Sequence, residues 1–342
     1  MCIFLDLKVQ NHLIVLDNRD LKLEAKGGAV FMAQINENTI RNCTFSDHIA
    51  KEGGAIHIDR SVNQIRFDRI YIEDCVFVAN KAVSWKFEWS TMGGAVFLGP
   101  DGVAIINRCT FKNNELMNTP DPTSAWGGAI YASGSEIRMS GCIFYNNTAS
   151  AMGGAVYIGA TGHISITTSL FLSNRAETGG AVYTEKPWRV DKQSLTIVNV
   201  RFINNSAIYG GAVRIEGSGV KIIRNCIFVN NTAATIGQSV LANCAITLNN
   251  TYFEAFESTN TFHLHSEAAS GVTSITNTTL HLHRNEISRG MKSNALYISS
   301  PLIKVFSSLK VKCPKGFNVG ERNSSFRWSA SRIKKFTFLE LY

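Results

Sequence analysis

The chain has 342 residues, of which 45% are apolar, 27 are glycine and only 6 are proline, so it has enough apolar material for a large folded core. Its formal net charge of +8 is concentrated near the C-terminus, since residues 301–342 carry nine Lys or Arg against two Glu. No basic stripe runs through the remainder, and no run approaches the roughly 20 apolar residues of a membrane helix. The composition therefore argues against a nucleic-acid partner and against a membrane segment within this chain.

Residues 1–26 precede the first copy of an internal repeat and are predicted to form an N-terminal coil or cap. They lack the basic start, the sustained apolar stretch and the small-residue cleavage site of an export signal. We therefore expect the chain to be a piece of a longer protein whose signal and anchor lie outside these residues.

The repeat is marked by three kinds of residue at fixed spacing. Gly-Gly-Ala recurs at intervals of 26, 40, 34, 26, 26 and 31 residues, beginning at Gly27, Gly53, Gly93, Gly127, Gly153, Gly179 and Gly210. A phenylalanine precedes each later glycine pair, or the degenerate pair at residues 237–238, namely Phe45, Phe77, Phe111, Phe144, Phe171, Phe202 and Phe228. Three residues further on come His48 in the first copy and then Asn80, Asn114, Asn147, Asn174, Asn205 and Asn231.

A unit of about 26 residues with short alternating runs, such as residues 163–167, cannot bury its own apolar face, so successive units must stack. The sequence predicts an all-β fold, a right-handed parallel β-helix. This single-stranded solenoid has roughly ten coils over residues 27–303 and regular repeats to about residue 240.

Each column of equivalent residues then has a physical role. Phenylalanines form an interior stack, the asparagine amides pair with neighbouring coils, and paired glycines permit a tight corner. After Gly-Gly-Ala, one alternating set is predicted to point inward: Val30, Ile56, Val96, Ile130, Val156, Val182 and Val213. The other set is predicted to face outward, because an unpaired buried arginine would be costly: Phe31, His57, Phe97, Tyr131, Tyr157, Tyr183 and Arg214.

Three insertions interrupt the repeat, around residues 82–92, 115–126 and 184–194, and they contain four of the five tryptophans, Trp85, Trp89, Trp126 and Trp188. The first two leave the same corner of consecutive coils and should lie side by side. Insertions on one face of a solenoid often carry its binding function, and tryptophan is enriched in binding hot spots. The alternative is that these tryptophans pin long loops onto the solenoid.

Two histidine pairs lie in the less regular repeats that follow, at residues 263 and 265 and at residues 281 and 283. If their strands are neighbours, four imidazoles meet on the surface as a metal site; two solvated polar faces are the commoner case. We expect no metal and no cofactor. Residues 304–342 are predicted to form a separate basic tail.

The Gly-Gly-Ala-[Ile/Val] and Phe-x-x-Asn motifs resemble the repeats of the chlamydial polymorphic membrane proteins and related β-helix proteins of the pectin-lyase-like superfamily, over roughly residues 27–240. The resemblance implies a surface-displayed β-helical passenger used in adhesion. The bacterial family's autotransporter barrel has no counterpart within this length. Residues 313–317, Cys-Pro-Lys-Gly-Phe, resemble the opening of a cysteine-rich extracellular repeat of animal receptors, so the tail is a possible start of such a region.

Five cysteines fall two residues before the column phenylalanine: Cys43, Cys75, Cys109, Cys142 and Cys226. Ser169 and Val200 replace them in other copies, so a small core residue suffices and we predict buried thiols; disulfides between adjacent coils are the alternative. Sequons for N-glycosylation occur at Asn42, Asn146, Asn204, Asn230, Asn249, Asn277 and Asn323.

Aspartates show no repeated pairing on neighbouring coils, so no catalytic residues are predicted. The favoured function is a non-enzymatic extracellular or cell-surface scaffold for adhesion or ligand display, with a protein or glycan partner. The alternatives are a carbohydrate-active lyase or hydrolase, which acidic clustering on one outer face would favour, and a glycan-binding module that uses the tyrosine column.

Overall fold

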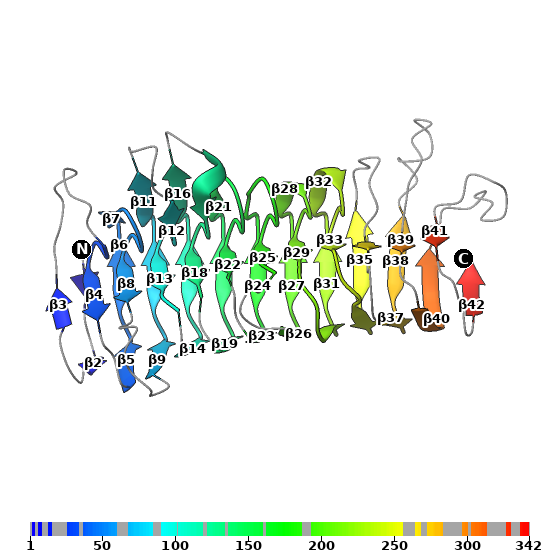
Figure 1. The fold of residues 1–342 in the computed structure, drawn as a ribbon, viewed down its shortest axis with the longest axis horizontal. Helices are drawn as coiled ribbons and strands as arrows, with labels where there is room; N and C mark the ends of the chain where they lie inside the picture. The colour runs from blue at the N-terminus through cyan, green and yellow to red at the C-terminus, as the bar shows by residue number, and fades with distance from the viewer. Residues whose placement is uncertain are drawn as a thin grey trace.

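The chain winds into one long solenoid, with its N-terminus at one end and its C-terminus at the other (Figure 1). The computed structural model describes residues 2–3, 6–8, 13–15, 26–33, 37–59, 68–84, 90–100, 102–118, 122–133, 136–159, 162–186, 193–255, 264–267, 272–282, 296–299, 302–312, 326–329 and 336–341, with side chains mainly between residues 26 and 281. Successive coils are joined by parallel strand pairing in register, as the repeat predicts.

One strand of each coil joins a 12-stranded sheet. Its members are β3 (Leu13–Val15), β4 (Val30–Ala33), β8 (Ile56–Asp59), β13 (Val96–Leu98), β18 (Ile130–Ala132), β22 (Val156–Ile158), β25 (Val182–Thr184), β29 (Val213–Ile215), β33 (Val240–Ala242), β36 (Leu264–Glu267), β39 (Leu296–Ser299) and β41 (Phe326–Ser329).

Two further strands of each coil join a 22-stranded sheet and are separated by a sharp bend. Before the bend lie β5 (Glu37–Arg41), β9 (Asp68–Glu73), β14 (Gly102–Asn107), β19 (Glu136–Ser140), β23 (His163–Thr167), β26 (Ser194–Val198), β30 (Lys221–Arg224), β34 (Thr247–Asn249) and β37 (Val272–Thr276). After it lie β6 (Thr44–Ser46), β10 (Val76–Val78), β15 (Thr110–Lys112), β20 (Ile143–Tyr145), β24 (Leu170–Leu172), β27 (Arg201–Ile203), β31 (Ile227–Val229), β35 (Tyr252–Ala255) and β38 (Thr279–Leu282).

Short strands at the remaining corner form three small sheets. They are β7 (Ile49–Ala50), β11 (Lys81–Ser84), β16 (Glu115–Asn118) and β21 (Thr148–Ala149); β12 (Thr91–Met92) and β17 (Ala125–Trp126); and β28 (Ser206–Tyr209) and β32 (Thr232–Ile236). A 3-10 helix, η1 (Pro122–Ser124), precedes β17.

The first strands run against the stack. β1 (Cys2–Ile3), β2 (Asp6–Lys8) and β3 pair antiparallel with β6, β5 and β4 of the first full coil. An antiparallel partner at the end of a parallel stack satisfies the backbone groups that would otherwise form an open sheet edge.

The prediction of a separate tail over residues 304–342 is wrong for the strands that the structure describes there. β40 (Leu302–Lys312) pairs parallel with both β37 and β38, and β42 (Phe336–Leu341) pairs with β40. β41 likewise continues the 12-stranded sheet. Alternating apolar residues such as those of 326–329 can extend a sheet even where the glycine corners have disappeared, and the basic charge concealed that signal.

The column phenylalanines are confirmed as a continuous interior stack. All seven are fully buried, and neighbouring ring centroids lie 4.6–5.0 Å apart. The stack extends one coil beyond the predicted repeat, because Phe253 continues it at 4.8 Å from Phe228. The inward set beginning with Val30 is also buried as predicted.

The asparagine ladder is confirmed in detail, and Asn147 illustrates it. Its backbone N–H and its Nδ2 both donate to Asn174 Oδ1 on the next coil at 3.0 Å. Its Nδ2 also donates to the Phe111 carbonyl of the preceding coil at 3.0 Å. Every ladder asparagine is fully buried, so these bonds satisfy polar groups that have no access to water.

The glycine pair fixes the corner for two different reasons. The first glycine has a positive φ, as at Gly153 with +66°, which side chains rarely adopt. The second has no room for one, because a Cβ on Gly154 would lie 2.1 Å from the Gly180 carbonyl oxygen. The following alanine is fully buried, and its carbonyl accepts two N–H bonds from the preceding coil, as Ala181 does from Ala155 and Val156.

The prediction that the second alternating column faces solvent is wrong for three of its seven members. His57 is fully buried, and Tyr157 and Tyr183 are only 3% and 6% exposed. These side chains do lie outside the interior core, but their rings stack on one another from Phe31 to Tyr183 at centroid separations of 4.3–5.3 Å. The outward placement was predicted because a buried arginine without a partner would be costly. Arg214 has a partner, because its guanidinium donates two hydrogen bonds to Glu216.

Candidate functional site

The first two insertions lie side by side, as their common corner predicted. β11 pairs in parallel with β16, and β12 with β17. Together with β7, β21 and η1 they form what we call the insertion lobe. Three of its residues form a small separate buried cluster with Ala151: Ala82, Leu116 and Ala125. The lobe is therefore an ordered platform that spans four coils, because its strands continue the ladder at the corner.

Trp126 pins this platform to the solenoid. Its ring packs on the lobe cluster and stacks on Tyr157 at 5.6 Å, on the outer face of the 12-stranded sheet. Its indole Nε1 is buried and has no hydrogen-bond partner in the described part of the chain. These contacts favour the pinning role for Trp126 over an exposed binding role. Trp85, Trp89 and Trp188 lie outside the described residues.

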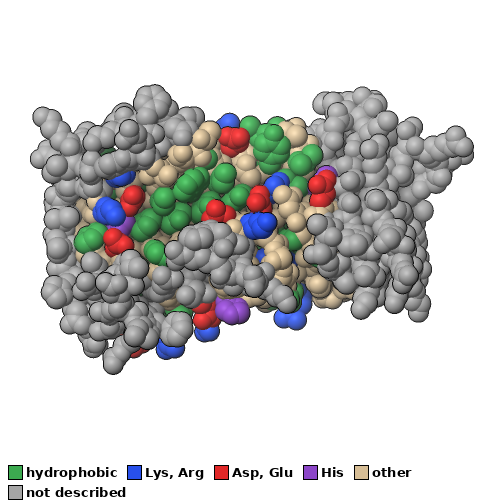
Figure 2. Space-filling view, in the orientation of Figure 1, with side chains coloured by type: hydrophobic (Ala, Val, Ile, Leu, Met, Phe, Trp, Pro, Cys, Tyr) green, Lys and Arg blue, Asp and Glu red, His purple; other side chains and the backbone are tan. Residues whose placement is uncertain are grey.

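The aromatic column forms a hydrophobic band on the outer face of the 12-stranded sheet, with charged side chains on either side (Figure 2). Burial raises the pKa of Tyr131 to about 12 and raises that of Tyr157 still further, so both hydroxyls stay protonated at neutral pH. A sugar ring binds to the open face of an aromatic ring. Here the faces of Tyr131 and Tyr157 are already covered by neighbouring rings 5.1–5.2 Å away. Tyr131 and Tyr157 therefore offer only their ring edges, which disfavours them as the predicted glycan-stacking surface.

Acidic residues lie beside this column. The aspartate pattern of the sequence did not predict them, because they are glutamates. Glu185 and Glu216 follow directly after Thr184 and Ile215, which are register partners, so the two glutamates occupy neighbouring coils. Glu216 forms two hydrogen bonds with Arg214, at 3.0 and 3.1 Å. Two coils further on, Glu267 binds His265 at 2.8 Å. The signal available in the sequence was a glutamate at a fixed distance after successive glycine pairs.

The described member of each predicted histidine pair lies in a different sheet. His265 lies on β36 in the 12-stranded sheet, whereas His281 lies on β38 in the 22-stranded sheet and binds Tyr252 at 3.0 Å. His263 and His283 lie outside the described residues. No group of three or more His, Cys, Asp or Glu side chains able to hold a metal ion occurs in the part of the chain that the structure describes.

Lys221 is a buried polar group that the sequence gave no reason to single out. It is 2% exposed and donates to the Gln193 side chain at 2.7 Å and to the Gln193 carbonyl at 3.1 Å. Burial lowers its pKa to about 8. These bonds fasten the C-terminal end of the third insertion to the next coil.

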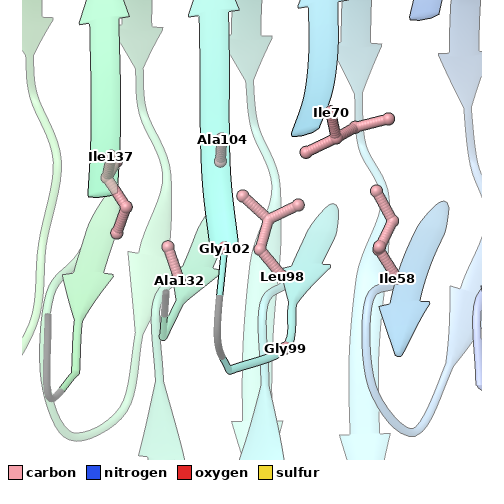
Figure 3. A pocket seen from close by; sticks show the side chains of 8 residues that line it. All are labelled: Ile58, Ile70, Leu98, Gly99, Gly102, Ala104, Ala132 and Ile137. Carbon is pink, nitrogen blue, oxygen red and sulfur yellow. The ribbon is translucent and has the colours of Figure 1, made fainter. Parts of the chain in front are cut away.

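A small apolar gap also lies inside the solenoid, at the corner where the 12-stranded sheet turns into the 22-stranded one (Figure 3). It has room for no more than about one water molecule, and its lining side chains are all apolar. Its lining consists of Ile58, Ile70, Leu98, Gly99, Gly102, Ala104, Ala132 and Ile137. It is a packing void and offers no ligand site.

The predicted cysteine column is buried. Six free thiols occur among the described residues: Cys43, Cys75, Cys109, Cys142, Cys226 and Cys244. A hydrogen bond with the Cys109 thiol, together with burial, raises the pKa of Cys75 to about 12, and burial raises that of Cys142 to about 11. The structure therefore holds inert thiols in place of inter-coil disulfides.

Six of the seven predicted sequons lie in the described part of the chain. Asn42, Asn146, Asn204 and Asn277 are exposed, while Asn230 and Asn249 are partly exposed. All of them except Asn249 have a positive φ and occupy corners of the coil. Asn323 lies outside the described residues.

Parallel strands in register, an interior aromatic stack and an internal asparagine ladder define a parallel β-solenoid. The chain belongs to the family described as right handed beta helix region, which matches residues 8–254. The chain is similar to metabotropic glutamate receptor-like protein R of Dictyostelium discoideum, with 35% identity over 144 residues. That match covers 42% of this chain and 8% of the relative. No solved structure matches.

The described residues include no helix that is long and apolar enough to cross a membrane.

Proposed function

We propose that this β-helix is a non-enzymatic extracellular or cell-surface scaffold that displays the insertion lobe to a protein or glycan partner. The observation that carries the proposal is the lobe itself. Two neighbouring coils both depart from the repeat, and the departures pair into one ordered platform. A solenoid needs no such platform for stability, because its regular coils already bury a continuous core.

The outer surface of the lobe has exposed apolar side chains suited to a partner. Met117 is 43% exposed and Ile49 is 39% exposed, on the neighbouring strands β16 and β7 that flank β11. Lys81 and Glu115 form an ion pair at 2.9 Å between them. Apolar residues rimmed by charge are typical of protein-binding surfaces.

The cell-surface location is supported by the similarity to a protein that is named as receptor-like. It is also supported by the density of sequons at exposed corners. The resemblance to polymorphic membrane proteins points in the same direction.

Beads coated with the chain should bind cultured eukaryotic cells, and Met117→Lys with Ile49→Lys should abolish the binding while leaving the thermal unfolding midpoint unchanged. Val220→Lys is the matched control, because Val220 is 61% exposed and lies outside the lobe. Equal binding by the lobe variant and the wild type would reject the lobe as the partner site. Trp126→Ala should instead lower the unfolding midpoint, since Trp126 is a packing contact.

A carbohydrate-active enzyme is the second candidate, and the neighbouring Glu185 and Glu216 favour it. Paired carboxylates are the catalytic unit of glycoside hydrolases. The ion pair between Glu216 and Arg214 opposes this role, because the Arg214 guanidinium already occupies the Glu216 carboxylate. The test is whether the chain releases reducing ends from a panel of polysaccharides. Activity in the wild type that is lost in Glu185→Gln would establish the enzyme and reject the scaffold proposal.

A further inference from the structure

One stretch of the outer surface is apolar across four consecutive coils. It consists of the outward residues of β20, β24, β27 and β31, which pair in register. Seven of the eight outward positions are apolar, with Arg201 as the exception: Ile143, Tyr145, Leu170, Leu172, Ile203, Ile227 and Val229. We call these seven residues the apolar strip.

The strip is unusually exposed for side chains of this kind. Ile143, Tyr145 and Ile227 are 42%, 38% and 37% exposed. On the preceding coil the same positions hold Thr110 and Lys112, and on the following coil Glu254 replaces the second apolar residue. The four apolar coils therefore lie between coils that each carry a polar or charged residue at these positions, and the repeat does not require apolar residues here, although Val76 and Val78 of β10 are apolar as well.

The corner directly after the strip carries three sequons. Asn146 follows Tyr145, Asn204 follows Ile203 and Asn230 follows Val229, each with φ of 52–54°. The remaining coil of the strip has Ser173 at this corner. On the preceding coil Asn113 has the same conformation, with φ of 55°, but Glu115 stands where a sequon needs Ser or Thr. Within this column the sequons are thus confined to coils of the apolar strip.

The side chains at this corner can accept a glycan without losing their contacts. Asn146 Nδ2 donates to Asn113 Oδ1 at 2.9 Å, and Asn230 Nδ2 donates to Asn204 Oδ1 at 2.8 Å. An amide nitrogen has two hydrogens. N-glycosylation joins this nitrogen to the anomeric carbon of an oligosaccharide carried on a polyprenyl diphosphate, which leaves as the diphosphate while one amide proton is released. The second hydrogen can still donate.

We propose that N-linked glycans on Asn146, Asn204 and Asn230 cover the apolar strip of this solenoid. The proposal rests on the extracellular location proposed above. Its physical basis is that the exposed faces of these strands would otherwise favour association between copies of the chain. A glycan attached one residue beyond each of Tyr145, Ile203 and Val229 is tethered beside the surface that it covers.

The test removes the glycans without touching the asparagines, because their left-handed backbone is part of the corner. The triple variant Thr148→Ala, Ser206→Ala and Thr232→Ala, secreted from eukaryotic cells, destroys all three sequons. Treating the wild type with an enzyme that removes N-glycans should lower its intact mass by the mass of the glycans at these three sites. We expect the triple variant to lack that decrease. We also expect loss of the monomer in size-exclusion chromatography and a rise in fluorescence of a hydrophobic dye.

Ser173→Ala is the matched control, because it changes the same corner without removing a sequon. Ala79 already occupies this corner position two coils before the strip, with φ of 54°. It should stay monomeric. Adding Ile143→Thr and Ile227→Thr to the triple variant should restore the monomer, because threonine already occupies that column at Thr44, Thr110 and Thr279. Should the triple variant fail to be secreted, the same two threonines must restore secretion, or the inference is overturned.

Two other results would overturn it: secreted protein with glycans at Asn42 or Asn277 but none at the three corner sites, or a triple variant that remains monomeric with unchanged dye fluorescence. The cell-binding assay is independent. A glycosylated, monomeric chain that binds no cells would reject the scaffold proposal and leave this inference standing.

Discussion

Replacing His57 by phenylalanine should stabilise the solenoid and remove part of its sensitivity to acid. The imidazole is fully buried between Phe97 and Phe31, with centroid separations of 4.3 and 5.3 Å. Neither ring nitrogen has a hydrogen-bond partner within 3.5 Å among the described residues. The nearest carboxylates, on Glu52 and Asp59, are 3.6 and 3.9 Å away, and Lys26 lies 3.5 and 3.7 Å from them.

Two effects set the magnitude. A buried polar atom without a partner costs about 1–3 kcal/mol, so His57→Phe should raise the unfolding free energy by about 2 kcal/mol at neutral pH. Burial also lowers the pKa of His57 below its ordinary 6.5. The unfolded chain therefore binds the proton more readily, and the wild type should lose up to about 1.4 kcal/mol per pH unit as the pH falls from about 6.5 toward the folded-state pKa.

Urea unfolding at a series of pH values from 7.5 down to 4.5, roughly two units on the acid side of the unperturbed histidine value, measures both effects. The difference in unfolding free energy between His57→Phe and the wild type should grow as the pH falls. His163→Gln is the control, because His163 is exposed and bonded to Ser194 at 2.7 Å. Parallel curves for the wild type and His57→Phe, or a destabilised variant at pH 7, would refute the reasoning.

Three further outcomes are expected from the same structure. Gly154→Ala should prevent folding, because its Cβ would meet a carbonyl oxygen at 2.1 Å, whereas Gly159→Ala, with its nearest contact at 3.4 Å, should fold like the wild type by circular dichroism. Asn174→Ala removes the acceptor of two buried N–H groups, so chemical denaturation should show a loss of about 2–4 kcal/mol, and a loss below about 1 kcal/mol would contradict the ladder's role. The six described cysteines should resist alkylation in the native protein and react once it is unfolded, as mass spectrometry can follow; recovery of disulfide-linked peptides would contradict this.

Stacking was predictable from the sequence because each column repeats a residue whose function depends only on the coil above and below. The residue type at each position therefore indicates its surroundings. The ring of Phe111 needs burial, the buried amide of Asn147 needs hydrogen-bond partners, and the crowded corner at Gly154 excludes a Cβ. The side-by-side placement of the insertions followed from the same logic, since equivalent corners of adjacent coils are about 4.8 Å apart.

Which side chains of the outer face are exposed could be decided only by the tertiary structure. Strand alternation places His57 and Tyr157 outside the interior core, but it does not say whether other groups cover them, and both are buried. Arg214 was taken as evidence of exposure, although its charge is matched by Glu216 two residues along the same strand face. The apolar strip beside its sequons emerged only from the register and the exposed fractions. A local repeat thus determines the contacts between coils, whereas exposure depends on everything that surrounds a side chain.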